Sequence, residues 1–324
     1  MESPVGSRRP IAVAHHPPAI DRRQILSVTP LETGTVLAGK LEVAGAWQLE
    51  SPNHHFGGYS ALLALPDGNL FAASDGGRML RFAPPDGPGG AAEFDHFAVR
   101  KKSDRALRDL EGLTRDPASG KMWAVYEGRN MILRLDPDFR RTGAVRPAAM
   151  RNWPGNAGPE AIVRLADGRF VVLSEGSPRW FARGLPALLF PGDPVSGAEP
   201  AEFTFVPPRG YRPVDAALLP DGRVLVLVRQ VRWRLPPRFA AKLVVADPAS
   251  IRPGRRWSGA TVAEIDAPLP TDNYEGLAVE PQENGRAAVW LISDDNRAHY
   301  QRTLLLKLAW PPNEKARGTS RAPS

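Results

Sequence analysis

Residues 158–175 read GPEAIVRLADGRFVVLSE, in which a glutamate is followed by an apolar run, an Asp-Gly turn and a second apolar run. The dipeptide Asp167-Gly168 is a strong hairpin signal, because the tight turn between two antiparallel strands needs positive φ angles. Residues 161–166 and 169–174 have the length and the Val, Leu and Phe content of strands. The segment therefore predicts a β-hairpin with an acidic residue near each end.

The same pattern recurs along the chain. Four further segments open with Gly58-Tyr59-Ser60-Ala61-Leu62, Asp109-Leu110-Glu111-Gly112-Leu113, Pro213-Val214-Asp215-Ala216-Ala217 and Asn273-Tyr274-Glu275-Gly276-Leu277. Each leads to a turn and a second apolar run, and third strands are expected at 79–82, 131–135, 187–190, 242–246 and 303–308. The five copies start about 45 to 60 residues apart, which is the size of a propeller blade.

We therefore predict an all-β fold, a β-propeller, with six blades as the preferred number and five or seven as alternatives. Strands near 35–50 and 261–267 are not assigned to any of the five repeats. They would supply a sixth blade, and a strand from each end of the chain would close the ring. A two-sheet sandwich is the other architecture, but it does not explain why an acid recurs at one spacing from the turn. We expect one domain at 31–310, a flexible arm at 1–30 and a flexible tail at 311–324.

The composition narrows the chemistry. The chain has 324 residues, no cysteine and a formal net charge of +7. The lack of cysteine excludes disulfides, thiolate catalysis and Cys-based zinc or iron–sulfur sites. The basic residues are scattered, without a nucleic-acid-binding arm, and no apolar run approaches the ~20 residues of a membrane-spanning helix. We expect a soluble monomer whose partners include neither nucleic acid nor a membrane.

Acidic residues stand near the start of the strand that should line the central channel in four of the five repeats. These first acids are Glu111, Glu160, Asp215 and Glu275. A second set follows the second strand of four repeats, and its members are Asp75, Glu127, Glu175 and Asp294. Because equivalent positions of a propeller converge on one axis, these carboxylates should gather at one mouth of the channel and bind a cation. Calcium suits such a ring of oxygens better than magnesium or zinc.

The acids also have a purely structural interpretation, in which each bonds to backbone amides of a neighbouring blade without a metal ion. Asp215 fits the ring less well, since it lies one residue nearer its Asp-Gly turn than Glu160 does. Ser60 stands at the equivalent position of the first repeat.

Arginines follow the second acids on the same type of loop. Arg78, Arg129, Arg179 and Arg297 are candidates for binding an anionic substrate, and the alternative is that each forms a local ion pair that braces its loop. His299 lies just beyond Arg297 and is a candidate general acid near neutral pH, with a solvated loop histidine as the alternative.

At these positions the sequence resembles the phytase-like family described as "esterase-like activity of phytase". The matching motifs are Gly58-Tyr59-Ser60-Ala61 with Ser74-Asp75, Asp109-Leu110-Glu111-Gly112-Leu113, Pro159-Glu160-Ala161-Ile162 with Ser174-Glu175, Leu219-Pro220-Asp221-Gly222-Arg223 with residues 225–229, and Asn273-Tyr274-Glu275-Gly276-Leu277 with Ser293-Asp294-Asp295-Asn296. The chain departs from the pattern at Ser60 and at Val228-Arg229-Gln230, where acids would be expected.

The resemblance implies a β-propeller, calcium-dependent hydrolysis of a phosphoester by analogy with propeller phytases, and often a periplasmic or secreted protein. No signal peptide is evident, because Arg8-Arg9 and Arg22-Arg23 are followed by polar and proline-rich sequence, so the compartment stays unassigned. The leading hypothesis is a calcium-dependent phosphoric ester hydrolase. The alternatives are a non-catalytic propeller that binds a protein or a small ligand, and a lactonase-like calcium-dependent hydrolase.

Overall fold

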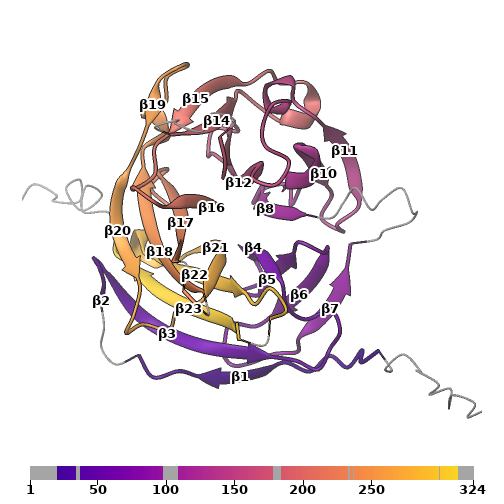
Figure 1. Cartoon of the computed structure of the whole chain (residues 1–324). Coiled ribbons are helices and arrows are strands. Elements are labelled where there is room, and N and C mark those ends of the chain that lie inside the picture. The colour runs from indigo at the N-terminus through magenta and orange to yellow at the C-terminus, as the bar shows by residue number, and fades with distance from the viewer. Residues whose placement is uncertain are drawn as a thin grey trace, which may run out of the picture.

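The computed structural model describes residues 20–33, 37–97, 109–177, 184–232, 234–235, 237–298 and 300–312. Within them the strands form five sheets arranged radially around a central channel, as Figure 1 shows. The channel-lining strands contact one another in the order β4, β8, β12, β16, β21 and back to β4. The all-β propeller predicted from the repeat is therefore confirmed.

The first three blades follow one another along the chain. The first blade contains β4 (Tyr59–Ala64), β5 (Leu70–Ser74), β6 (Arg78–Phe82) and β7 (Glu93–His96). The second contains β8 (Leu110–Arg115), β9 (Met122–Tyr126), β10 (Met131–Leu135) and β11 (Arg141–Val145). The third contains β12 (Pro159–Arg164), β13 (Phe170–Ser174), β14 (Leu185–Phe190) and β15 (Ala201–Phe205), with the short β19 (Arg256–Trp257) pairing parallel to β15.

The last two blades complete the ring. The fourth contains β16 (Arg212–Leu218), β17 (Val224–Arg232), β18 (Arg238–Ala246) and β20 (Ala260–Ile265). The fifth contains β21 (Asn273–Pro281), β22 (Ala287–Asp294), β23 (Thr303–Trp310) and β3 (Leu41–Glu50), flanked by β1 (Ser27–Pro30) and β2 (Leu37–Ala38). Short 3-10 turns lie at Glu127–Arg129, Ala148–Met150, Pro194–Ser196, Pro248–Ser250 and Glu283–Gly285. No helix in the described part of the chain is long and apolar enough to cross a membrane.

The preferred number of six blades was wrong, and the alternative of five was right. The strands reserved for a sixth blade complete two others. The N-terminal β3 pairs antiparallel with the C-terminal β23, and the segment near 261–267 forms β20 at the outer edge of the fourth blade. Figure 1 shows the indigo β3 beside the yellow β23. Both ends of the chain thus contribute to the ring closure, as expected, but within one sheet.

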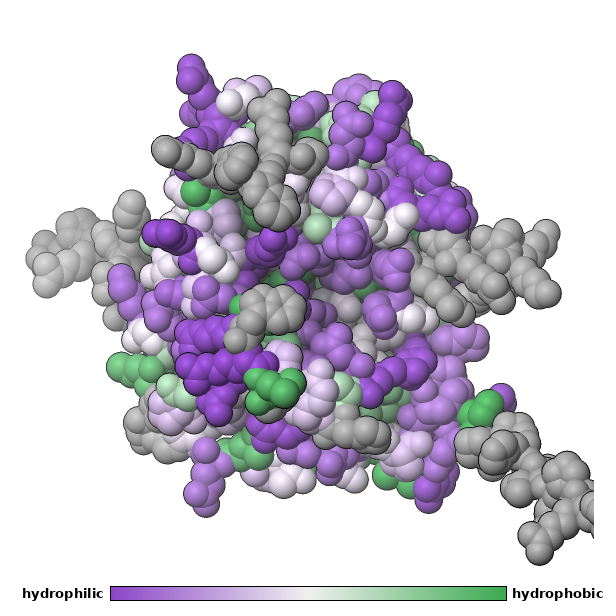
Figure 2. All heavy atoms as spheres, in the orientation of Figure 1, coloured by the Kyte–Doolittle hydropathy of each residue, from purple (hydrophilic) through white to green (hydrophobic). Residues whose placement is uncertain are grey.

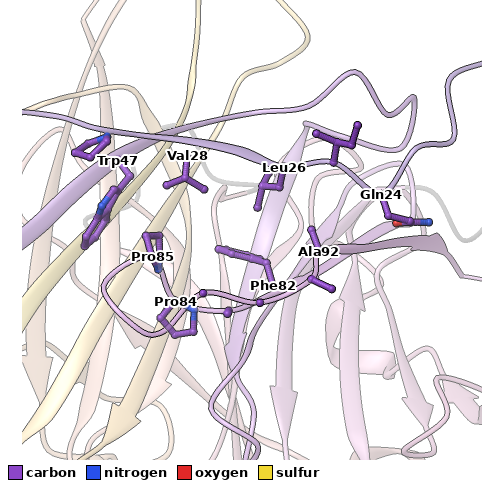
Figure 3. Close-up of a pocket in the computed structure, with 14 residues that line it drawn as sticks. Gln24, Leu26, Val28, Trp47, Phe82, Pro84, Pro85 and Ala92 are labelled. Carbon is purple, nitrogen blue, oxygen red and sulfur yellow. The ribbon is translucent and has the colours of Figure 1, made fainter.

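The described part of the N-terminal arm is held against the propeller. Ser27–Pro30 pairs with β3, and the Phe94 N–H donates to Gln24 Oε1 at 2.6 Å. A groove of about 500 Å³ lies between this segment and the loop at 83–92. Figure 3 shows Leu26 and Phe82 on opposite sides of it. None of its described lining residues has a titratable side chain.

The hydrophobic core is divided among the interfaces between neighbouring blades. Trp123 of the second blade contacts Phe170 of the third, with ring centroids 4.8 Å apart. In the fifth blade, the fully buried Trp290 lies against Trp47, with centroids 5.9 Å apart. Truncation of such an aromatic side chain typically costs about 3–5 kcal/mol, so the blade interfaces fix the ring that positions the channel-lining residues.

Candidate metal centre

A β-bulge near the start of each channel-lining strand fixes where the first acids lie. In the second blade Leu110 pairs with Tyr126 and Gly112 pairs with Val125, so Glu111 between them has no partner on β9. The residue skipped in the same way in the five blades is Ser60, Glu111, Glu160, Val214 and Glu275, in chain order. A bulge re-aims the side chain of its extra residue. The repeat thus places one bulged residue per blade at the same end of the channel.

Glu111, Glu160 and Glu275 come together at this end. Glu160 is only 8% exposed, the Glu275 side chain is 15% exposed, and Glu111 is partly buried. Burial, and next the charge of Glu275, raise the pKa of Glu111 well above its ordinary range. Burial, and next the charge of Glu111, do the same to the pKa of Glu160. The three carboxylates therefore lie close enough to repel one another, and a cation would relieve that repulsion.

The second set of acids lies where each second strand ends. The Glu127 N–H donates to Asp109 O at 2.9 Å and the Glu175 N–H donates to Gly158 O at 3.0 Å, so the ladder extends by one residue in both blades. The residue at this position in the five blades is Asp75, Glu127, Glu175, Arg229 and Asp294, in chain order. Asp294 is 8% exposed, and burial followed by the charge of Glu275 raises its pKa to about 8. Asp75 is exposed.

Three of these acids form a group with the geometry of a cation site. Glu127, Glu160 and Glu175 each place a carboxylate oxygen within 4.8 Å of the oxygens of the other two. Beside them, Asn130 Oδ1 is buried and has no hydrogen-bond partner among the described residues. A Cβ on Gly158 would lie 2.4 Å from this oxygen and 3.3 Å from Glu127 Cγ, so the glycine leaves room for both side chains. Carboxylate and amide oxygens are the ligands that calcium takes in proteins, and the residues present fit it.

Arg229 is the one basic residue at the second position. Its side chain is 16% exposed, and Nη2 lies 3.1 Å from Glu175 Oε1. Nη1 forms an ion pair with Glu275 and donates to Asn273 Oδ1. The guanidinium thus joins a carboxylate of the third blade to a carboxylate of the fifth. The sequence interpretation noted that an acid was missing here but did not include Arg229 in the site.

Asp215 lies outside this cluster, because it follows the bulge by one residue instead of occupying it. Its carboxylate is fully buried and accepts hydrogen bonds from the Leu277 N–H at 2.7 Å and from the Ala216 N–H at 2.8 Å. Burial raises its pKa well above the ordinary range. Asp215 therefore joins the fourth blade to the fifth through the backbone. This geometry agrees with the alternative in which an acid bonds to backbone amides of a neighbouring blade without a metal ion. In the sequence, the shorter spacing between Asp215 and its Asp-Gly turn indicated the difference.

The arginines predicted to bind an anion are placed less uniformly. Arg78 is half-buried, whereas Arg129 and Arg297 are exposed. In the described residues none of the three forms an ion pair with an acid, so the local ion pairs of the alternative interpretation are not seen there. Arg179 and His299 lie outside the described residues.

The opposite end of the channel has a different character. A cavity of about 690 Å³ there is lined by the far ends of the five inner strands, including Leu113, Leu218 and Val279. Among its described lining residues the charged ones are Arg115, Arg164 and Asp221, which form no group of acids. In the orientation of Figure 2 hydrophilic side chains predominate on the visible face, and apolar ones are scattered in small groups. The converging carboxylates at the bulged end are therefore the best candidate for the site.

The chain matches a protein-family model over most of its length. The model of a phytase-like family, described as esterase-like activity of phytase, matches residues 54–297. A solved structure titled "Structure of Dos1 propeller" is similar over 85% of this chain and 76% of that chain, with 9% sequence identity and a TM-score of 0.38. A search of curated proteins finds no match.

Proposed function

The chain belongs to the phytase-like family described as esterase-like activity of phytase, and from this premise we propose that it is a calcium-dependent hydrolase of phosphoric esters. Glu127, Glu160 and Glu175 would hold the cation, with Asn130 Oδ1 as a fourth oxygen. The observation that carries the proposal is the approach of three carboxylate oxygens to within 4.8 Å of one another. Such an approach of like charges is costly unless a cation or protons compensate it.

The surrounding residues would serve the same reaction. When bound, a divalent cation neutralises charge on a phosphate ester and lowers the pKa of a coordinated water. Glu111 and Glu275 strengthen the negative field at the cation position, since both raise the pKa of Glu160. Arg78, Arg129, Arg179 and Arg297 remain proposals for contacts with the anionic substrate, and His299 remains a proposal for the general acid. Asp75 and Asp294 remain proposed metal ligands.

The test combines calcium binding with hydrolysis. Calcium should raise the Tm of the wild-type protein and should be required for the release of p-nitrophenol from p-nitrophenyl phosphate. Glu160→Gln should lose both responses. Glu264→Gln is the matched control, because Glu264 is a mostly exposed glutamate paired with Lys242 far along the fourth blade, and it should keep both.

Two outcomes would replace the proposal with its alternatives. Hydrolysis of the lactone dihydrocoumarin without hydrolysis of p-nitrophenyl phosphate would identify a lactonase-like enzyme that uses the same cation. No calcium response and no hydrolysis would identify a propeller that binds its ligand without catalysis.

Asp215 favours a structural role for at least one acid, since it bonds to the Leu277 backbone of the neighbouring blade.

A further inference from the structure

The fourth blade lacks an acid at both repeated positions of the site. Its bulged residue is Val214, where three other blades have a glutamate, and its second-strand residue is Arg229, where the other four blades have an acid. The backbone register is the same in the fourth blade as in its neighbours. The difference therefore lies in the side chains alone.

The Arg229 guanidinium occupies the space between two glutamates. It lies 3.1 Å from Glu175 Oε1, forms an ion pair with Glu275, and is held by Asn273, which also donates to Glu275 Oε1 at 2.8 Å. All three charged side chains are less than one-fifth exposed. Removing one partner from such a buried arrangement leaves the other charges uncompensated.

We infer that Arg229 is an internal cation that takes the place of a second metal ion, so that the acidic cluster holds a single divalent cation, on the side of the second and third blades. The inference rests on the proposed function and specifies its stoichiometry. Two observations support it. Among the described residues only Glu127, Glu160 and Glu175 meet the geometry of a cation site, and the unpaired Asn130 Oδ1 lies near Glu127 of that group.

The arrangement also makes Arg229 a positioning residue for the cation site. Glu175 belongs both to the ion pair with Arg229 and to the three-carboxylate group. A guanidinium forms directional hydrogen bonds and keeps its charge at every accessible pH. Arg229 therefore holds the Glu175 carboxylate in place before the cation arrives, and among the described ion pairs it has none with Glu127 or Glu160.

Isothermal titration calorimetry with calcium chloride tests the inference on the full chain. The wild-type protein should bind one calcium ion. Arg229→Glu places an acid at this position in all five blades and should bind two calcium ions. Without calcium, the Tm of this variant should fall by about 5 °C or more, because Glu175 and Glu275 lose their counter-charge. Arg229→Lys keeps the charge and should bind one. Arg229→Gln removes the charge without adding an acid, and calcium should raise its Tm more than that of the wild type.

The outcomes separate this inference from the proposed function. One ion in both the wild type and Arg229→Glu, or two in the wild type, would overturn the inference while the calcium site stands. No ion in the wild type but one in Arg229→Glu would show that Arg229 occupies a cation position, but it would overturn the single-ion stoichiometry and remove the proposed function. If Arg229→Glu folds only with calcium, the inference is supported. If it does not fold at all, Arg229→Gln decides, and an unchanged Tm response to calcium in that variant would refute the inference.

Discussion

The third and fourth blades have the same backbone register but differ in charge at two equivalent positions. The third blade carries Glu160 at its bulge and Glu175 after its second strand, whereas the fourth carries Val214 and Arg229. The fourth blade does have an acid, Asp215, but one residue later, where it is buried and bonds to backbone amides. A shift of one residue along a strand thus separates a carboxylate available to a ligand from one used for blade packing.

The largest effect should come from the acid of the fourth blade. Asp215→Ala leaves the buried Leu277 and Ala216 N–H groups without an acceptor, and we expect the free energy of unfolding to fall by about 3 kcal/mol. Urea denaturation measures it. Asp215→Asn, which keeps one acceptor oxygen, should lose about half as much. The calcium affinity of folded Asp215→Ala should stay within about twofold of the wild type, and a large loss of affinity would place Asp215 in the metal site instead.

The acid of the third blade should behave in the opposite way. Glu160→Gln should weaken calcium binding by about 100-fold, or about 2.7 kcal/mol, because it removes a charged ligand from the three-carboxylate group. Its stability without calcium should not decrease, since the change removes a buried charge that is repelled by Glu111. Calorimetry measures the calcium affinity, and urea denaturation measures the stability without calcium. Loss of stability without loss of calcium affinity would mean that Glu160 braces the blades.

The fifth blade should give the protein a pH dependence. The pKa of Asp294 is about 8 in the folded state, against an ordinary value of 3.8, because the carboxyl is buried beside Glu275. The folded state therefore binds more protons than the unfolded state between these values. Without calcium, the contribution of Asp294 to the free energy of unfolding should fall as the pH rises from about 4 to about 8, by at most about 1.4 kcal/mol per pH unit.

Urea denaturation as a function of pH tests this linkage. Asp294→Asn should flatten the slope, because the amide does not titrate. Asp266→Asn is the control at an exposed aspartate paired with Arg232 and should keep the slope. Equal slopes in the wild type and in Asp294→Asn would show that other carboxyls cause the pH dependence.

The smallest effect should come from the exposed arginines. If Arg297 contacts the substrate anion, Arg297→Gln should raise KM for p-nitrophenyl phosphate by about threefold and leave kcat within experimental error, since contacts of exposed charges contribute about 1 kcal/mol or less. Initial rates at varied substrate concentration measure this. Arg140→Gln, at an exposed arginine paired with Asp138 in the second blade, is the control. An unchanged KM would remove Arg297 from the proposed site.

The sequence predicted the repeat, the all-β propeller and the convergence of Glu111, Glu160 and Glu275, because one periodic pattern determines all three. The number of blades could not be predicted. The β-strand propensity of the N-terminal strand is the same whether that strand starts a new sheet or completes the last one. The burial of Arg229 and its contacts with two blades depend on the closed ring. The spacing between the acid and the turn did distinguish Asp215 from the other acids. A residue that is one position nearer the turn follows the bulge instead of occupying it, and its side chain is directed differently.

The pairing of β3 with β23 determines when the parts of the site can form during synthesis. Because β23 follows every other strand of the five sheets in the sequence, the ring stays open until β23 has emerged from the ribosome. Glu127, Glu160 and Glu175 belong to two successive blades and can approach each other long before that point. The contact of Arg229 with Glu275 must wait for the fifth blade. A nascent chain would therefore present its cation ligands to the surrounding ions before its own arginine has found both of its partners.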